Sequence, residues 1–264
     1  MKTLANKTVW ITGASSGIGE ALAYELARQG ARLILSARNE KELNRVRAAC
    51  ASPDRHVVVP LDLERYRELE ARADEVWQAH GPIDVLVNNA GVSQRYLGLE
   101  SSLALDEKIM NVNFFGTTAL TRPIARRMVA RGEGHLAVVS SVLGLYGIQT
   151  RTAYAASKHA LRGYFDSLRN ELVHTPVKVT VIYPGYITTR VSENALNAQG
   201  QPHGRVDEGH AQGISPEACA RRIVTALEKD ESEVIIAGPK EWLGVLMSRY
   251  VPGLFRRLAP KLKV

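Results

Sequence analysis

Short apolar runs alternate with longer amphipathic stretches along most of this chain. Runs of about four to seven apolar residues predict buried strands, and apolar residues recurring every three or four positions predict helices. The predicted strands are 9–12, 33–36, 57–61, 85–88, 136–140, 177–183 and 234–237. The predicted helices are 17–29, 39–50, 65–80, 105–130, 152–172 and 216–229.

This alternation of strand and helix indicates the fold class. Strands without a polar face need cover on both sides, which crossover helices provide. We therefore expect an α/β fold: a Rossmann-type, doubly wound parallel sheet of about seven strands with helices on both faces. The 264 residues show no linker or repeat, so one domain spanning 1–264 is predicted. The polar stretch 191–213 has no clear period and predicts a long loop or lid.

The positive charge of the chain is concentrated near its C-terminus. The formal net charge is +7, but residues 240–264 hold six basic side chains against Glu241 and so carry +5. The rest of the chain is nearly balanced, and it has no nucleic-acid-binding motif. We therefore predict no nucleic-acid partner.

The segment 238–264 mixes apolar and basic residues, and Pro252-Gly253 is expected to divide it into two short helices. Two interpretations stay open. The segment packs on its own domain with a solvated basic face, or it makes peripheral contact with an anionic membrane surface. Its charges and prolines exclude a membrane-spanning helix.

The cysteines and histidines indicate neither a disulfide framework nor a metal site. Cys50 and Cys219 are far apart in the sequence, and the seven histidines show no His-x-x-x-His pattern or nearby cysteine. Residues 1–7 have no apolar signal core. The sequence therefore predicts a cytoplasmic protein without a metal.

A glycine-rich turn follows the first strand, in Gly13-Ala14-Ser15-Ser16-Gly17-Ile18-Gly19. Glycines allow a tight turn and close approach of a pyrophosphate, and the following helix offers free N–H groups. The same residues fit the G-x-S-x-G elbow of hydrolases, with Ser15 as nucleophile. That alternative lacks an earlier strand-helix unit to supply an oxyanion hole, and it leaves Gly19 unexplained.

The end of the second strand indicates which dinucleotide binds. Turns that bind NAD place a carboxylate there for the ribose 2′-hydroxyl, but this chain has no carboxylate before Glu40. Arg38 can pair with a 2′-phosphate, and Ser36 can add a hydroxyl. We therefore predict NADP(H) in preference to NAD(H). The alternatives for Arg38 are stacking on adenine or facing solvent.

Further motifs follow in a fixed order. They are Asp62, Asn88-Asn89-Ala90-Gly91, Asn113, Ser141, Tyr154-Ala155-Ala156-Ser157-Lys158 and Pro184-Gly185-Tyr186-Ile187-Thr188-Thr189. Together with the glycine turn, their order and spacing resemble the short-chain dehydrogenase/reductase family over residues 8–238. Within that family the later half is most similar to the branch of member 7B, a relative of the 11β-hydroxysteroid dehydrogenases.

This resemblance implies a set of site residues. The implied catalytic residues are Asn113, Ser141, Tyr154 and Lys158. The implied cofactor-binding residues are Gly13, Ser15, Ser16, Gly17, Ile18, Gly19, Ser36, Arg38, Asp62, Leu63, Asn89, Ala90, Gly91, Tyr154, Lys158, Pro184, Gly185, Ile187 and Thr189. Six loop residues are expected to face the pocket or solvent: Ser93, Gln94, Arg95, Tyr146, Gln149 and Arg151.

The catalytic set suits the reduction of a carbonyl. Tyr154 and Lys158 are four residues apart and share a helix face, so the ammonium can lower the pKa of the phenol from its usual value of about 10. By resemblance, Lys158 also holds the nicotinamide ribose. Ser141 would hydrogen-bond the substrate oxygen, and Asn113 would bind a water that links Lys158 to solvent.

The sequence therefore predicts an oxidoreductase that transfers a hydride between NADP(H) and a carbonyl or secondary alcohol. The resemblance implies a substrate of lipid or steroid character. The alternative is a non-catalytic dinucleotide-binding or sensing protein on the same fold. The predicted helices at 105–130 and 152–172 are apolar, and in the family they pair across a two-fold axis. A homodimer or homotetramer is therefore expected.

Overall fold

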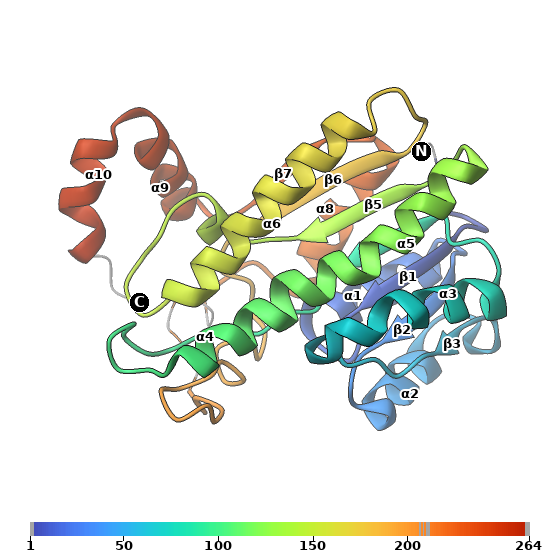
Figure 1. Ribbon diagram of the computed structural model, residues 1–264, viewed down its shortest axis with the longest axis horizontal. Helices are drawn as coiled ribbons and strands as arrows, with labels where there is room; N and C mark the ends of the chain where they lie inside the picture. The colour runs from blue at the N-terminus through green and yellow to red at the C-terminus, as the bar shows by residue number, and fades with distance from the viewer. Residues whose placement is uncertain (1–2, 206, 208, 210–211, 262–264) are drawn as a thin grey trace.

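A parallel β-sheet forms the centre of the molecule. The computed structural model describes residues 3–205, 207, 209 and 212–261. Within these residues, seven strands pair in the order β3-β2-β1-β4-β5-β6-β7, and each pairing is parallel (Figure 1). The strands are β1 (Thr8–Thr12), β2 (Arg32–Ser36), β3 (Val57–Val58), β4 (Val85–Asn88), β5 (His135–Val139), β6 (Lys178–Pro184) and β7 (Glu233–Ile236). This confirms the predicted sheet.

Helices cover both faces of the sheet. They are α1 (Gly17–Arg28), α2 (Glu40–Ala49), α3 (Leu69–His80), α4 (Leu103–Met110), α5 (Gly116–Arg131), α6 (Thr152–Glu171), α8 (Pro216–Glu228), α9 (Pro239–Tyr250) and α10 (Pro252–Leu258). One apolar core joins α1, α2 and α8, and a second joins α3, α5 and α6. Val9 and Ile11 of β1 enter the first core, whereas Trp10 between them enters the second. Because successive side chains of a strand point to opposite faces, a doubly covered strand needs an unbroken apolar run.

The long helix predicted at 105–130 is interrupted in the structure. α4 ends at Met110, a π-helical segment covers Asn111–Phe115, and α5 begins at Gly116. A π-helical turn is rare and is often found at a functional site. This one contains Asn113, one of the predicted catalytic residues.

The third strand and third helix are both shorter than predicted. β3 pairs only two residues with β2, although the prediction covered 57–61. A 3₁₀ segment at Leu63–Glu68 precedes α3. The side chain of Asp62 caps that segment by accepting a hydrogen bond from the Glu64 N–H at 3.1 Å. This cap ends the extended chain and begins the helical segment before position 65.

The C-terminal segment forms two helices, as predicted. α9 and α10 meet at Val251, directly before Pro252. Val245 and Phe255 pack against the loop after β5, so the segment docks on its own domain. Leu243 and Leu254 stay exposed, at 57% and 51%. In the part of the chain described here, no helix is both long and apolar enough to cross a membrane. The predicted tail residues Leu262 and Lys263 lie outside the described residues.

Candidate active site

The glycine-rich turn connects β1 to α1. Gly13 and Gly17 have φ angles of +67° and +58°, a region that residues with a side chain rarely adopt. A Cβ atom on Gly19 would lie 2.2 Å from the Gly13 carbonyl oxygen, so only glycine lets the helix begin this close to the loop. Gly17 and Ile18 line a cleft. The helix therefore begins at the cleft, where its N-terminus favours a phosphate group.

Thr12 and Asn89 brace this turn. Asn89 Nδ2 donates hydrogen bonds to the carbonyl oxygens of Thr12 and Gly13, at 3.0 and 3.2 Å. Thr12 Oγ1 accepts from the N–H groups of Asn89 and Ala90, at 3.0 and 3.1 Å. These bonds join the ends of β1 and β4, where the strand order reverses and where such sheets bind dinucleotides. In the sequence Thr12 begins the turn that resembles the cofactor turn of the family, Thr12–Gly19, but it was not among the predicted cofactor-binding residues.

The cleft has a volume of about 690 Å³ and lies along the carboxyl ends of the strands. It gathers residues from the glycine turn, from the segments after β2 to β6, and from α6. The predicted residues that line it are Gly13, Ser15, Ser16, Gly17, Ile18, Arg38, Asp62, Leu63, Asn89, Ala90, Gly91, Ser141, Tyr154, Lys158, Pro184, Gly185, Ile187 and Thr189. The fold therefore brings most of the predicted site into one concave surface.

Gly19, Ser36 and Asn113 do not line the cleft. Gly19 permits the close packing of the glycine turn, as described above. Ser36 is 1% exposed, and its hydroxyl oxygen accepts a hydrogen bond from the Trp10 indole at 2.9 Å. The structure therefore corrects the prediction that Ser36 contacts the cofactor. Its side chain lies on the same side of the sheet as Trp10, within the core.

Asn113 is fully buried in the π-helical segment. Its Oδ1 accepts from the Val92 N–H at 2.8 Å, and its Nδ2 donates to the Val92 carbonyl at 3.0 Å and to Ser157 Oγ at 2.9 Å. Asn113 thus joins the loop after β4 to α6. A Cβ on Gly91 would approach Asn113 Oδ1 and Lys158 Nζ, at 3.2 and 3.5 Å, so both polar atoms lie close to this glycine. The water relay through Asn113 stays a prediction.

Tyr154, Lys158 and Ser141 meet in the cleft. Lys158 Nζ donates to the Val139 carbonyl at 2.9 Å and lies 5.6 Å from the centroid of the Tyr154 ring. Ser141 lies close enough to the Tyr154 phenol to lower its pKa, and its hydroxyl donates a hydrogen bond to the Pro184 carbonyl at 3.4 Å. The Tyr154 N–H donates to Gln94 Oε1 at 3.1 Å, which fixes the first turn of α6 against the loop after β4. The helix and the end of β5 thus present a phenol, an ammonium and a hydroxyl together.

Burial changes the pKa values of both titratable groups. It raises the pKa of Tyr154, while the hydrogen bond from Ser141 and the charges of Arg95 and Arg151 lower it. Burial also lowers the pKa of Lys158 to about 8. Near neutral pH Tyr154 therefore carries its proton and can act as an acid. The two arginines contribute positive charge there, a role the sequence analysis assigned to Lys158 alone.

The remaining loop residues divide between the cleft and other positions. Ser93, Arg95, Tyr146 and Arg151 line the cleft, beside the apolar side chains of Val142, Leu143 and Ile148. Gln94 is fully buried and holds the backbone of Tyr154. Gln149 lies outside the cleft and donates to the Pro260 carbonyl at 3.5 Å. We call the part lined by these loops the substrate end of the cleft.

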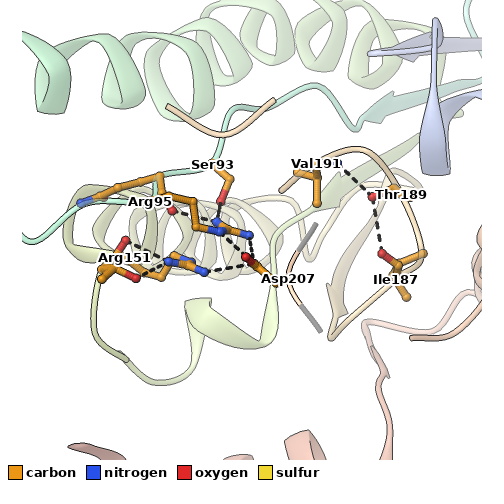
Figure 2. A network of polar contacts seen from close by, with 9 residues as sticks. Ser93, Arg95, Arg151, Ile187, Thr189, Val191 and Asp207 are labelled. Carbon is orange, nitrogen blue, oxygen red and sulfur yellow. Dashed lines mark hydrogen bonds and ion pairs between the residues drawn. The ribbon is translucent and has the colours of Figure 1, made fainter. Parts of the chain in front are cut away.

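The sequence analysis missed two acidic residues at the site. Glu241 of α9 lines the cleft and accepts a hydrogen bond from the Tyr186 N–H at 3.3 Å. Asp207 lies between Arg95 and Arg151 (Figure 2). No motif or spacing marks either residue, because each reaches the site only through the path of a distant segment. Among the described residues, no group of three or more His, Cys, Asp or Glu side chains could hold a metal ion.

Comparison with known proteins agrees with this geometry. The family model described as short chain dehydrogenase matches residues 7–200. A short chain dehydrogenase/reductase from Burkholderia phymatum in complex with NAD superposes with a TM-score of 0.85 at 24% identity, covering 100% of both chains. A metagenomic short-chain oxidoreductase in complex with NADP has a TM-score of 0.72 at 30% identity, covering 88% of this chain and 97% of that one. The chain belongs to the short-chain dehydrogenase/reductase family of oxidoreductases.

The comparison with curated relatives also identifies the branch of the family to which this chain is similar. The chain is 41% identical over 260 residues to dehydrogenase/reductase SDR family member 7B of Bos taurus. The alignment covers 96% of this chain and 80% of the relative. The resemblance to the member 7B branch, inferred above from the later half of the chain, is therefore confirmed.

Proposed function

We propose that this protein is an NADP(H)-dependent oxidoreductase that interconverts a carbonyl and a secondary alcohol. The observation that carries the proposal is the meeting of Tyr154, Lys158 and Ser141 in the same cleft as the glycine turn. Reduction with NADPH of a panel of ketones and aldehydes, followed by the loss of nicotinamide absorbance, tests it. The apolar wall of Val142, Leu143 and Ile148 supports a substrate of lipid or steroid character.

The residues divide the proton chemistry between them. A bound nicotinamide supplies the hydride that adds to the carbonyl carbon. Tyr154 donates its phenolic proton to the carbonyl oxygen, so that a C–H and an O–H bond replace the C=O π bond. Ser141 donates a hydrogen bond to the same oxygen and positions it. Lys158 places a positive charge beside the phenolate that remains, which stabilises it until it is reprotonated.

The cofactor end of the cleft suits a dinucleotide with a 2′-phosphate. Gly13 leaves no space for a Cβ, which would lie 2.8 Å from the Ala90 Cα, so the loop can approach a pyrophosphate closely. Arg38 lines the cleft directly after β2, and its side chain is exposed. A guanidinium there can form paired hydrogen bonds with a phosphate. Ser36, whose hydroxyl is buried beside Trp10, does not line this part of the cleft.

Arg38→Ala is expected to lower kcat/KM for NADPH about tenfold, which corresponds to the loss of one charged hydrogen bond of about 1.5 kcal/mol. The value for NADH should stay unchanged, because NADH has no 2′-phosphate. Steady-state kinetics with both cofactors measures this. Arg47→Ala, an arginine of α2 outside the cleft, is the matched control. Equal kcat/KM values of the wild type with NADH and NADPH would contradict the preference.

Carbonyl reduction is expected to slow as the pH rises above about 8. Burial lowers the pKa of Lys158 to about 8, so the ammonium loses its charge above that pH and no longer stabilises the Tyr154 phenolate. Below it, Lys158 is charged and Tyr154, whose pKa is raised, keeps its proton. The pH profile of kcat/KM for NADPH-dependent reduction checks this. A rate that increases through pH 8 would contradict the assignment.

A homo-oligomer and a peripheral membrane contact remain part of the proposal. Apolar side chains of the C-terminal helices are exposed beside basic ones, with Leu243, Leu246 and Leu254 close in sequence to Arg249 and Arg256. This mixture supports contact with an anionic bilayer surface. We also propose a cytoplasmic location, which the two free cysteines, Cys50 and Cys219, support.

A further inference from the structure

Two buried arginines at the substrate end of the cleft share one carboxylate (Figure 2). Arg95 donates to Asp207 Oδ2 from Nε at 2.8 Å and from Nη2 at 2.5 Å. Arg151 donates to the same oxygen from Nη2 at 3.3 Å. The three side chains are only 6%, 3% and 10% exposed for Arg95, Arg151 and Asp207. Since burying a charge without a partner is costly, the carboxylate of Asp207 holds together two cations that otherwise repel.

The two arginines differ in how fully they are bonded. Arg95 Nη1 donates to Ser93 Oγ at 2.8 Å and to the Gln94 carbonyl at 2.7 Å, so its guanidinium is nearly saturated by the protein. Arg151 Nη1 donates to the carbonyl and hydroxyl of Thr150. Within the described residues its Nε makes no hydrogen bond. Arg151 lines the cleft, so it is the arginine with donor capacity left for a ligand.

The carboxylate comes from the connection between β6 and α8. Asp207 lies in this connection, whose residues 185–205 form a loop. The Leu196 N–H of this loop donates to the Ser93 carbonyl at 2.9 Å, and Leu196 in turn accepts from the Arg95 N–H at 2.8 Å. These bonds join the loop to the segment after β4 that carries Arg95. The loop that precedes Asp207 is therefore fixed to the segment that carries Arg95, and Asp207 itself is held by its ion pairs with Arg95 and Arg151.

The charges around this group favour competition between Asp207 and any anion in the cleft. Tyr154 and Tyr186 also face Arg151, but both are phenols, whose ordinary pKa of about 10 keeps them neutral near pH 7. The group itself therefore carries two positive charges and one negative charge, and Glu241 adds a second carboxylate to the lining of the same cleft. A ligand carboxylate would be attracted by the two arginines. Asp207, however, already accepts hydrogen bonds from the guanidinium N–H groups that such a ligand would need.

We propose that Asp207 is a specificity-determining residue that filters substrates by charge. It occupies the arginine pair, so that the cleft takes neutral carbonyl compounds and disfavours those with a carboxylate beside the carbonyl. When the charge of Asp207 is removed, the Arg151 guanidinium beside Arg95 becomes able to bind an anion. We call this the latent anion site. This inference rests on the proposed carbonyl reduction and assigns a substrate class to the same site.

The experiment compares two substrates that differ in one charge. Phenylglyoxylate and its methyl ester carry the same ketone, and their ratio of kcat/KM with NADPH cancels effects on the cofactor. The wild type should prefer the ester. Asp207→Asn should raise the acid-to-ester ratio at least about tenfold, equivalent to about 1.4 kcal/mol. Asp207→Asn with Arg151→Gln should lose this gain, because the latent site then lacks its donor.

Glu193→Gln is the matched control, since Glu193 lies on the same loop but not on the cleft. Its acid-to-ester ratio should equal that of the wild type. A wild type that prefers the acid, or an unchanged ratio in Asp207→Asn, overturns the inference. Failure of every variant to reduce either compound means that neither is a substrate, and the panel of ketones and aldehydes then decides the proposed function. Thermal shift with phenylglyoxylate then still decides the inference: stabilisation of Asp207→Asn alone supports it, and no shift in any variant overturns it.

Discussion

Tyr154→Phe is expected to lower kcat for carbonyl reduction about 10²–10⁴-fold, the range that a positioned general acid contributes. The substitution removes only the phenolic hydroxyl, which lies in the cleft with Ser141 and Lys158, and leaves the ring in place. Binding of NADPH should be retained, since the glycine turn and Arg38 are untouched. Stopped-flow or steady-state reduction of the best substrate in the panel, together with NADPH fluorescence titration, separates the two effects.

Tyr164→Phe is the control for this prediction. Tyr164 lies on the same helix and packs edge-on against Phe114 and Phe165, away from the cleft. It should keep wild-type turnover. Unchanged turnover in Tyr154→Phe would contradict the proposed mechanism and would favour the alternative of a dinucleotide-binding protein without catalysis.

The second large effect is expected for Gly19→Ala. The added Cβ would lie 2.2 Å from the Gly13 carbonyl oxygen and 2.6 Å from Asn89 Nδ2, so the glycine turn must shift away from α1. Overpacking of this kind costs about 1–3 kcal/mol. We expect NADPH affinity to fall about 10–100-fold, which corresponds to about 1.4–2.8 kcal/mol, because the turn no longer holds the pyrophosphate position.

Two measurements and one control test this second prediction. Fluorescence titration gives the Kd for NADPH, and thermal unfolding should show a lower Tm, by about 2–4 °C for each kcal/mol lost in a chain of this size. Gly163→Ala is the control: Gly163 lies in α6, and a Cβ there meets no atom within 4 Å. That variant should bind NADPH normally. Wild-type affinity in Gly19→Ala would contradict the packing argument.

The order of strands and helices followed directly from the sequence. Apolar runs such as those containing Val9 and Val87 have no polar face, and this property is local to each run. The motifs around Gly13, Asn89 and Tyr154 were equally visible, because each lies within a few residues of a strand end or on one helix turn. Burial on both faces and the meeting of carboxyl ends then bring them together in any sheet of this type.

Details that depend on the partner of a side chain were not predictable in the same way. Ser36 has a hydroxyl at the expected position, but its bond to the Trp10 indole withdraws it from the cleft. The π-helical segment around Asn113 interrupts a pattern that the sequence presents as one continuous helix. In each case the side chain contacts a residue of another element, Trp10 for Ser36 and Val92 and Ser157 for Asn113. The neighbouring residues in the sequence do not indicate these contacts.

The sequence by itself therefore determined the fold class and the glycine turn, because these depend on short-range patterns of burial and turn geometry. Its resemblance to the family indicated Ser141, Tyr154 and Lys158, which the fold brings together in the cleft. Only the tertiary structure decided the charge of the substrate end. Asp207 is 56 residues from Arg151 and 112 from Arg95 along the chain, and it reaches them through a loop without periodicity. A carboxylate on such a loop has no local preference for its partners, which lie far away in the sequence and meet it only in the folded chain.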